Sequence, residues 1–348
     1  MPLPIIDTDY LTNFLTGLLN TPSPTGFTQH ATEYTRLALS AFPVLTISTN
    51  QKGSLIAAWP GVNADKPRAL TAHTDTLGAM VKEIKSNGRL RLTRIGSLIW
   101  PSVETEGCTV ITDNGTTVRG SLLITKASAH VHSSATNETP RTEENMELRL
   151  DARTTSAQET RELGINVGDF VVFDPRVELT NGFVRSRFLD DKACVACILA
   201  AVKALHDQGL APRQTTYLHF SNYEEVGHGA AAGIPTEVVE LVTVDMAAVG
   251  EGQNSDEFHA SLCVKDSGGP YHYSLNKKLR QLAEEYNIPY KIDIYPFYRS
   301  DGEAYWVAGG DVAVALIGPG VDASHNYERT HLEALEATTR WIIAYLLS

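Results

Sequence analysis

Five short segments of the sequence carry side chains that can bind a metal ion. Each segment lies at the end of an expected strand, within one, or in a turn beside one, and the residues are His73 and Asp75, Asp190 and Asp191, Glu224 and Glu225, Asp245, and His325. Imidazole and carboxylate groups are the usual nitrogen and oxygen ligands of Zn²⁺. Two histidines and three carboxylates suit a pair of such ions, because each ion takes one imidazole, one carboxylate and a shared bridging carboxylate. Two ions held in this way can polarise a carbonyl and activate water, which is the chemistry of amide hydrolysis.

Taken singly, most of these residues have an ordinary structural explanation. Asp190 or Asp191 could cap the helix that follows, and His73 could be a hydrogen-bonded core histidine. The adjacent acids of the third segment could be solvated loop residues. Asp245 is different, because the run Leu241–Val249 is apolar around it and a buried carboxylate is costly unless it is paired or bound to a metal. The set as a whole therefore predicts a metal site.

The elements that position these residues alternate between strands and helices. Expected strands cover residues 45–48, 54–59, 68–72, 215–221, 241–247, 290–295 and 312–317, and expected helices cover 9–19, 26–42, 191–208, 275–286, 300–307 and 332–347. A chemical residue that follows a buried strand of an α/β sheet lies where such sheets place their sites. The pattern predicts an α/β domain, with a mixed sheet flanked by helices, made from residues 1–83 and 180–348.

The stretch between residues 84 and 179 has a different texture. Short β-branched runs, separated by turn residues, replace the helix-length patterns, and they cover residues 90–95, 108–112, 117–124, 146–150 and 170–173. Such runs are typical of a small antiparallel barrel or sandwich. We therefore expect a β-rich insertion domain that interrupts the α/β domain.

Charge and composition exclude several other classes of protein. The 348 residues include 29 Lys and Arg against 41 Asp and Glu, for a net charge of -12, and no basic run is present. Binding to nucleic acid over a broad surface is not expected from that balance. No stretch approaches the ~18 uninterrupted apolar residues of a membrane helix, and the N-terminus lacks the basic region of a signal peptide. The expected location is the cytoplasm, without membrane attachment.

With these motifs in order, the sequence resembles a known family of enzymes. It is similar to the glutamyl aminopeptidase or tetrahedral aminopeptidase family (FrvX-like) of co-catalytic metallopeptidases, and the resemblance spans nearly the whole chain. The motifs that carry it are Ala72-His-Thr-Asp-Thr-Leu-Gly78, Leu189-Asp-Asp-Lys192, Tyr223-Glu-Glu-Val-Gly227, Val244-Asp-Met246 and Ser324-His-Asn-Tyr-Glu328.

The resemblance implies a role for each candidate residue. One metal ion would be bound by His73 and Asp245, the second by His325 and Glu225, and both by Asp190, while Glu224 would be the general base and Asp75 would orient His73. The two divalent ions are expected to be Zn²⁺, with Co²⁺ or Mn²⁺ as alternatives. The implied substrates are short peptides, from which the N-terminal residue would be cleaved. The insertion would build a homo-oligomer, up to the dodecameric tetrahedron of the family.

Two departures from the family pattern and two alternative functions stay open. Lys192 follows the paired acids where the family commonly has Arg, so a bidentate contact could be lost. His325 is followed by Asn-Tyr-Glu where the family usually has Ser-Pro, which affects the expected contacts on the substrate side. The same metals could serve an amidohydrolase or deacylase acting on a small N-acylated or osmoprotectant-type peptide. An inactive metal-binding scaffold is the other alternative, although a scaffold would not need a base at Glu224.

Overall fold

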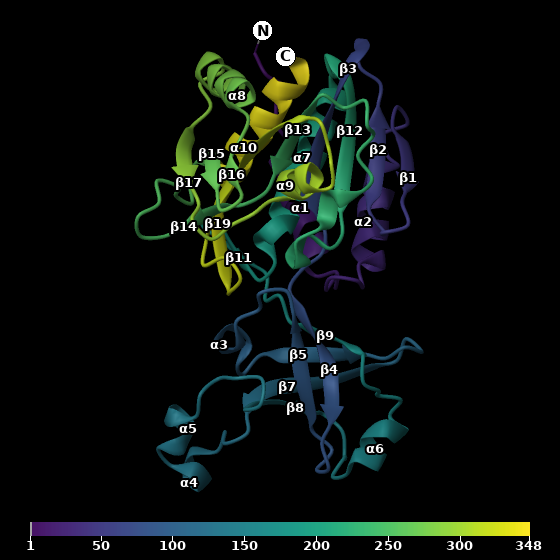
Figure 1. Ribbon diagram of the computed structural model, residues 1–348, viewed down its shortest axis with the longest axis vertical. Helices are drawn as coiled ribbons and strands as arrows, with labels where there is room; N and C mark the ends of the chain where they lie inside the picture. The colour runs from purple at the N-terminus through teal and green to yellow at the C-terminus, as the bar shows by residue number, and fades with distance from the viewer. Residues whose placement is uncertain (1) are drawn as a thin grey trace. The chain divides into compact units, whose positions relative to one another are not determined.

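The structure is a computed structural model that describes residues 2–348, and the chain divides into two units. The first unit runs up to Asp75 and continues over Arg176–Ser348, and the second unit is Thr76–Pro175 (Figure 1). The sequence placed the boundaries later, after residues 83 and 179. They lie earlier because β4 (Gly78–Ile84) pairs with strands of the second unit, whereas β10 (Glu178–Thr180) pairs with β11 (Phe183–Ser186) of the first.

Four parallel strands form the centre of the first unit's sheet. Their order is β12 (Gln214–Ser221), β3 (Asn63–His73), β13 (Glu240–Val244) and β18 (Ala313–Asp322). Both faces of these strands are covered, which explains why their sequences are almost continuously apolar. Because all four point the same way, the residues at and after their carboxyl ends gather at one edge of the sheet.

The other strands extend the sheet on both sides of this centre. Beyond β12 lie β2 (Leu55–Trp59) and β1 (Thr46–Thr49), both antiparallel to their neighbours. Beyond β18 lie β19 (Glu328–His331), β11 and β10, with β14 (Ala247–Val249), β15 (Ala260–Asp266), β16 (Gly269–Pro270) and β17 (Tyr290–Ile294) attached at its side. The sheet is therefore mixed, as the sequence predicted.

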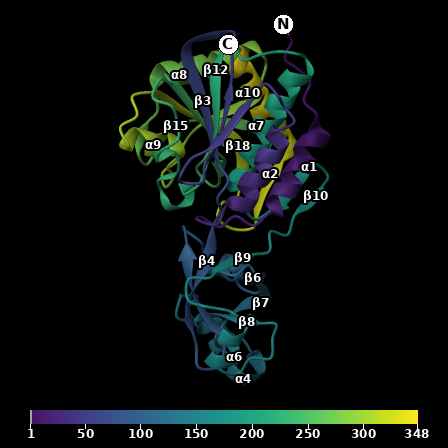
Figure 2. The same cartoon turned by 90° about the vertical axis from the view of Figure 1, so that its right-hand side faces the viewer.

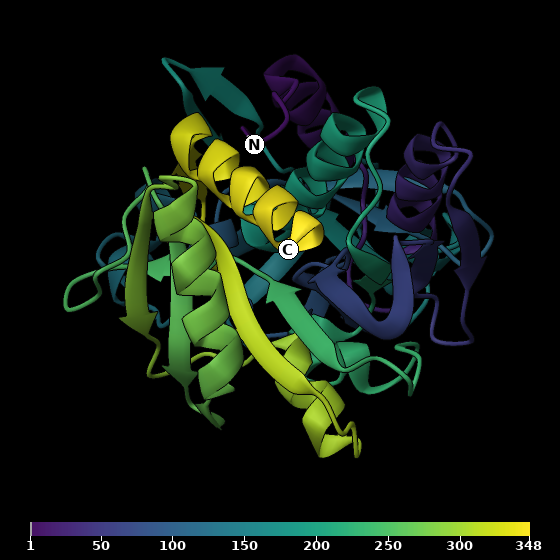
Figure 3. The same ribbon diagram turned by 90° about the horizontal axis from the view of Figure 1, so that it is seen from above.

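Helices cover the two faces of the sheet unequally. They are α1 (Thr8–Leu19), α2 (Gln29–Leu39), α7 (Leu189–Asp207), α8 (Tyr273–Glu285), α9 (Asp301–Val307) and α10 (Leu332–Leu347). Two 3₁₀ turns, η1 (Glu224–Val226) and η2 (Gly229–Ala231), lie between β12 and β13. Figure 2 shows α1, α2, α7 and α10 on one side of the strands and α9 on the other, and Figure 3 shows α10 and α7 side by side over the sheet.

Alternation along the strands separates the two hydrophobic cores. Leu70 and Val242 face the larger core with α1, α7, α8 and α10, while their neighbours Ala69 and Leu241 face the smaller core, which includes Tyr305 of α9. This is the period-two pattern of side chains that point to opposite faces of a sheet. The larger core anchors the N-terminal end of α7, where the paired acids lie.

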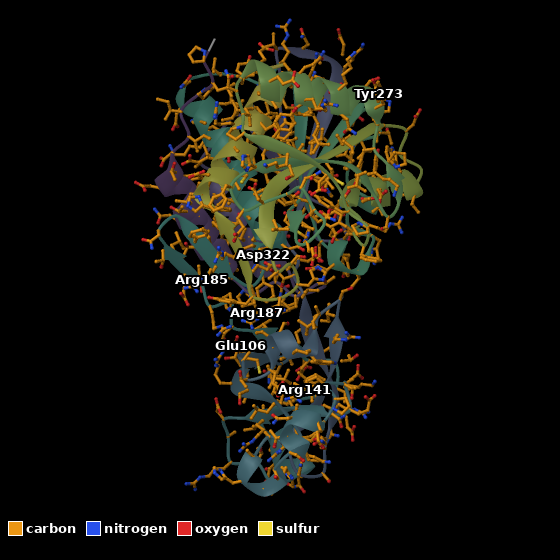
Figure 4. All side chains as sticks on the ribbon, turned by 90° about the vertical axis from the view of Figure 1, so that its left-hand side faces the viewer. Glu106, Arg141, Arg185, Arg187, Tyr273 and Asp322 are labelled. Carbon is orange, nitrogen blue, oxygen red and sulfur yellow. The ribbon has the colours of Figure 1, made fainter. Side chains whose placement is uncertain are left out.

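The second unit is a closed barrel of six antiparallel strands. The strand order is β4, β5 (Leu90–Ile95), β8 (Met146–Leu150), β7 (Thr117–Ile124), β6 (Gly107–Ile111) and β9 (Phe170–Phe173), accompanied by α3 (Trp100–Val103), α4 (Ala129–His132), α5 (Ala135–Glu138) and α6 (Ala157–Glu162). Buried residues such as Val81, Leu122 and Val171 fill its interior. Arg141, labelled in Figure 4, binds Glu104 through Nε at 2.8 Å and Nη2 at 3.0 Å. The predicted β-rich barrel is confirmed.

Candidate metal centre

The five expected metal ligands meet at the carboxyl edge of the parallel strands. His73 is the last residue of β3, and Asp245 follows β13 directly. Glu225 lies in η1, which follows β12, and His325 lies three residues after the end of β18. Asp190 lies at the start of α7, which packs against β3 and β18. The topology of the sheet thus brings together residues that span more than 250 positions of the chain.

Two sets of ligand atoms share the carboxylate of Asp190. The first set is His73, Asp190 and Asp245, and the second is Asp190, Glu225 and His325, with the ligand atoms of each set within 4.8 Å of one another. His73 Nε2 lies 3.0 Å from Asp190 Oδ1, whereas His325 Nε2 lies 3.4 Å from Asp190 Oδ2. Each imidazole therefore faces a different oxygen of the same carboxylate, which is the arrangement that a bridging ligand requires.

Asp75 holds the turn that carries the adjacent glutamates. Its Oδ1 accepts a hydrogen bond from the backbone N–H of Glu224 at 3.2 Å, and its Oδ2 accepts from the N–H of Glu225 at 3.3 Å and from the hydroxyl of Thr25 at 2.7 Å. His73 Nδ1 lies 2.8 Å from the Asp75 carbonyl oxygen but 3.7 Å from its carboxylate. Because a carbonyl oxygen can only accept, Nδ1 is the donor of this bond, and Nε2 is the nitrogen that a metal ion would bind. The carbonyl of Asp75 thus orients the ring, and its carboxylate orients the glutamates.

Glu224 lies next to the first ligand set but belongs to neither set. Its Oε2 lies 3.7 Å from His73 Nε2. A carboxylate in this place can reach a water molecule or a substrate amide located between the two sets. The geometry is consistent with the expected division of labour between Glu224 and Glu225.

Two further carboxylates brace the centre. From the sequence, Asp191 was expected only as a metal-binding candidate or a helix cap, and Glu328 had no expected role. Glu328, the first residue of β19, accepts the backbone N–H of Asp190 through Oε2 and that of His325 through Oε1, both at 3.1 Å. Asp191 Oδ2 accepts the backbone N–H of His73 at 3.1 Å, and the peptide bond between Asp190 and Asp191 is cis. Glu328 belongs to the motif Ser324-His-Asn-Tyr-Glu328, which carries part of the family resemblance. Its position three residues after His325 is the sequence signal that could have indicated its supporting role.

Asp301 supports the segment that follows the glutamates. Its Oδ1 accepts the N–H of Ala230 at 2.7 Å, and its Oδ2 accepts the hydroxyl of Ser221. A Cβ at Gly229 would come within 2.2 Å of the Asp301 carboxylate, so only glycine fits there without displacement. Asp301 therefore fixes both the end of β12 and η2. In the sequence, Asp301 lies in the expected helix over residues 300–307, which gives no sign of this contact.

Lys192 makes a single hydrogen bond from the interior. The residue is 1% exposed, and its Nζ donates to the carbonyl oxygen of Thr21 at 2.7 Å. Burial lowers the pKa of Lys192 to about 7. One backbone carbonyl does not require the two-pronged geometry of a guanidinium, so lysine suffices at this position.

The charges of the centre favour a bound cation. Burial, followed by the neighbouring charge of Asp190, raises the pKa of Glu225 to about 8 and that of Asp245 to about 7. Burial opposes ionisation of Asp190 as well, yet hydrogen bonds to His325 and His73 hold its pKa well below the usual range. Two histidines cannot neutralise this many buried acids. Divalent cations would supply the missing positive charge, and the mixed imidazole and carboxylate ligands suit Zn²⁺ or a similar ion.

The comparison with known families decides the membership of the chain. The profile of the M42 glutamyl aminopeptidase family matches residues 53–341. The chain belongs to this family. The resemblance seen in the sequence is confirmed, and so is the prediction that the protein is an enzyme of the peptidase class.

Individual relatives cover nearly the whole chain. A Bacillus subtilis (strain 168) protein named as an aminopeptidase, YhfE, is 48% identical over 332 residues, which are 95% of each chain. The TET aminopeptidase of a marine sediment archaeon, Thaumarchaeota archaeon SCGC AB-539-E09, superposes with a TM-score of 0.87 at 18% identity and covers 98% of this chain and 96% of its own. The TET1 peptidase of Pyrococcus horikoshii gives a TM-score of 0.84 at 22% identity, with 97% and 99% covered. These two structures share the fold of this protein.

Within residues 2–348, no helix is both long enough and apolar enough to cross a membrane.

Proposed function

We propose that this M42 family member is an aminopeptidase that uses two divalent metal ions to remove N-terminal residues from short peptides. The observation that carries the proposal is the shared carboxylate of Asp190, which faces His73 with one oxygen and His325 with the other. Asp245 would complete the first ligand set and Glu225 the second. Bound Zn²⁺, or Co²⁺ or Mn²⁺, would polarise the peptide carbonyl and lower the pKa of water.

Side chains of the protein would transfer the proton of the attacking water to the leaving amine. Glu224 would take a proton from the attacking water and deliver it to the amine that leaves when the peptide bond breaks. Burial raises the pKa of Glu224 well above its usual range, and the surrounding acids add to this effect. A raised pKa suits a carboxyl that must both accept and donate a proton near neutral pH. Asp75 would keep that carboxyl in place by holding the backbone of the turn.

We also propose that the protein forms a homo-oligomer through its barrel. The TET1 peptidase of Pyrococcus horikoshii can assemble into a tetrahedron or a large octahedral shell, and the related PhTET1-12s is a dodecamer in its crystals. A shell of that kind would admit short peptides and exclude folded proteins. Light scattering should show a species several times heavier than the 37.9 kDa chain, and a monodisperse monomer at micromolar concentration would contradict the proposal.

One experiment tests the activity itself. The protein is stripped with a strong chelator, reloaded with each of the three metals, and assayed on a panel of amino acid amides and their N-acetylated counterparts. We expect hydrolysis only in the metal-loaded protein and only of amides with a free amino group. Full activity after chelation would refute the metal mechanism, and a preference for the N-acetylated amides would show a deacylase instead.

A further inference from the structure

The turn that carries Glu224 and Glu225 has left-handed backbone at both of its ends. Tyr223, just before the turn, has a φ of 75°, and Gly227, just after the glutamates, has a φ of 88°. Glycine adopts such angles readily, whereas a tyrosine keeps one only where its surroundings hold it there. The backbone N–H of His228 donates to the carbonyl oxygen of Tyr223 at 3.1 Å and closes the turn. The groups that hold these two ends therefore help to determine where the glutamates lie.

Lys52, in the loop between β1 and β2, contacts residues on both sides of this turn. Its carbonyl oxygen accepts a hydrogen bond from the side-chain amide of Asn222 at 3.2 Å, before the turn. Its Nζ donates to the carbonyl oxygen of His228 and, at 2.8 Å, to that of Gly229, after the turn. A single residue thus ties together the two ends of the segment that carries the glutamates.

The ammonium group of Lys52 also lies beside two stacked rings. The rings of Tyr223 and His228 are nearly parallel, with 16° between the planes and 5.3 Å between the centroids. Lys52 Nζ lies 5.7 Å from the Tyr223 centroid and 3.3 Å from His228 Nδ1. Because an ammonium group can only donate, His228 Nδ1 is the acceptor of this contact. The three N–H groups of Lys52 therefore have three acceptors, all in the segment that follows the turn.

Asp75 holds a different part of the same turn. Its carboxylate accepts the backbone N–H groups of Glu224 and Glu225 themselves, whereas Lys52 binds the residues that flank them. Lys52 belongs to neither ligand set. A substitution at Lys52 would therefore release the ends of the turn while every candidate ligand and the Asp75 carboxylate remain.

We propose that Lys52 is a positioning residue for the general base Glu224 and acts through the backbone of the turn. The inference rests on the proposed aminopeptidase function. A general base must lie within hydrogen-bond reach of the proton that it takes. Because a displacement of about 1 Å can lower a rate by about 100-fold, the ends of the turn need to be held firmly.

The positive charge of Lys52 offers an alternative cause for any effect on the rate. Burial lowers the pKa of Lys52, and the charges of Asp301 and Asp75 oppose that shift, so the ammonium interacts with acids that support the centre. Such a charge could stabilise these acids without holding the backbone. The two roles differ in what they require, because the hold needs N–H donors and the charge effect does not.

The substitution Lys52→Cys, followed by alkylation of the new thiol, separates the two roles. The thiolate displaces bromide from 2-bromoethylamine and gives a side chain of the length of lysine, with its charge and its N–H donors. The reagent (2-bromoethyl)trimethylammonium gives the charge without the donors. The four native cysteines are buried, and burial raises the pKa of their thiols, so alkylation should be confined to position 52.

The measurement is kcat and KM for the best amino acid amide at saturating metal. In Lys52→Cys we expect kcat to fall by about 10–100-fold while KM stays near that of the parent, because Lys52 does not touch the substrate. Aminoethylation should restore kcat, and the trimethylammonium group should not. Lys278→Cys, treated in the same way, is the matched control and should keep the parent's kcat. The Lys278 side chain is 28% exposed and binds Glu240 at the amino end of β13, the opposite edge of the sheet.

Four results would overturn the inference. They are a parent-like kcat in Lys52→Cys, recovery with the trimethylammonium reagent, no recovery with either reagent, and a loss that excess metal removes. The last result would mean that Lys52 acts on the ligand Glu225 and not on the base. Untreated and aminoethylated samples share one polypeptide, so a difference in kcat between them cannot come from misfolding of the variant. A parent enzyme without hydrolytic activity would instead overturn the proposed function, and this inference with it.

Discussion

The substitution Glu328→Gln examines how far the backbone of the metal centre depends on a residue that binds no metal. Glu328 is 2% exposed, and its two oxygens accept the N–H groups of Asp190 and His325 at 3.1 Å each. Glutamine has the same shape but presents an NH₂ group in place of one oxygen. One backbone N–H would then face a donor, and either the bridging carboxylate or one imidazole would lose its support.

The size of the effect follows from the bond that is lost. A hydrogen bond to a charged group contributes about 1.5–3 kcal/mol, which corresponds to roughly 10–150-fold in an equilibrium constant. Part of this loss lowers the stability of the fold rather than the affinity for metal. Residues that orient metal ligands typically change metal affinity by about 10–100-fold, and we expect Glu328→Gln within that range. At saturating metal the kcat should stay within a few-fold of the parent, because every ligand and Glu224 remain.

The assay is a competition titration against a chromophoric chelator, together with kcat measured at increasing metal concentration. Glu333→Gln is the matched control, because the Glu333 side chain is 68% exposed and lies in the adjacent first turn of α10. The control should bind metal like the parent. Unchanged metal affinity in Glu328→Gln would refute the idea that this carboxylate holds the ligands. A collapse of kcat at saturating metal would refute the separation between support and chemistry.

Three other predictions concern the adjacent glutamates Glu224 and Glu225, the carboxylate of Asp75, and the buried imidazole of His219. Glu224→Gln should lower kcat by about 10²–10⁴-fold, and elemental analysis should show that it keeps its metal. Glu225→Gln should show a reduced metal content in the same analysis. The reverse result would mean that Glu225 is the base and Glu224 the ligand. Asp75→Asn keeps only one accepting oxygen, so kcat should fall while circular dichroism stays native, and an unchanged kcat would contradict its hold on the turn. Burial lowers the pKa of His219 to about 4, so the unfolded state binds more protons between pH 6.5 and 4, and stability falls by about 3 kcal/mol on acidification across that range. The Tm of His219→Gln should therefore fall less than that of the parent between pH 6.5 and 4. An equal fall in Tm would contradict the lowered pKa of His219.

The sequence indicated the placement of the metal ligands because that placement depends on local order along the chain. A residue such as His73 or Asp245 at the end of a buried strand needs only the direction of the strand to be located. In a sheet with four parallel central strands, all such ends meet at one edge. The alternation of strands and helices that predicts this sheet is visible in the sequence without any knowledge of contacts.

Features that depend on pairing between distant segments were not accessible in the same way. The strand β4 looks like a continuation of the α/β domain until its partners β5 and β9 are known, which explains the eight-residue difference in the first boundary. The two roles of Asp75 also required the fold, because its carboxylate meets backbone groups about 150 positions away.

In the candidate metal centre, one group of acids holds the backbone and another supplies the expected metal ligands. Asp75, Asp191 and Glu328 each accept backbone N–H groups of the residues that carry ligands or the base. The backbone that carries the candidate ligands is therefore held by acids that are not themselves in either ligand set. This arrangement places several acids close together in the interior. Burial, followed by the negative charge of neighbouring acids, raises the pKa of Glu328 and of Asp191 well above the usual range. Cations bound by the two ligand sets would offset that charge, so the acids that support the ligands would also favour the binding of divalent ions.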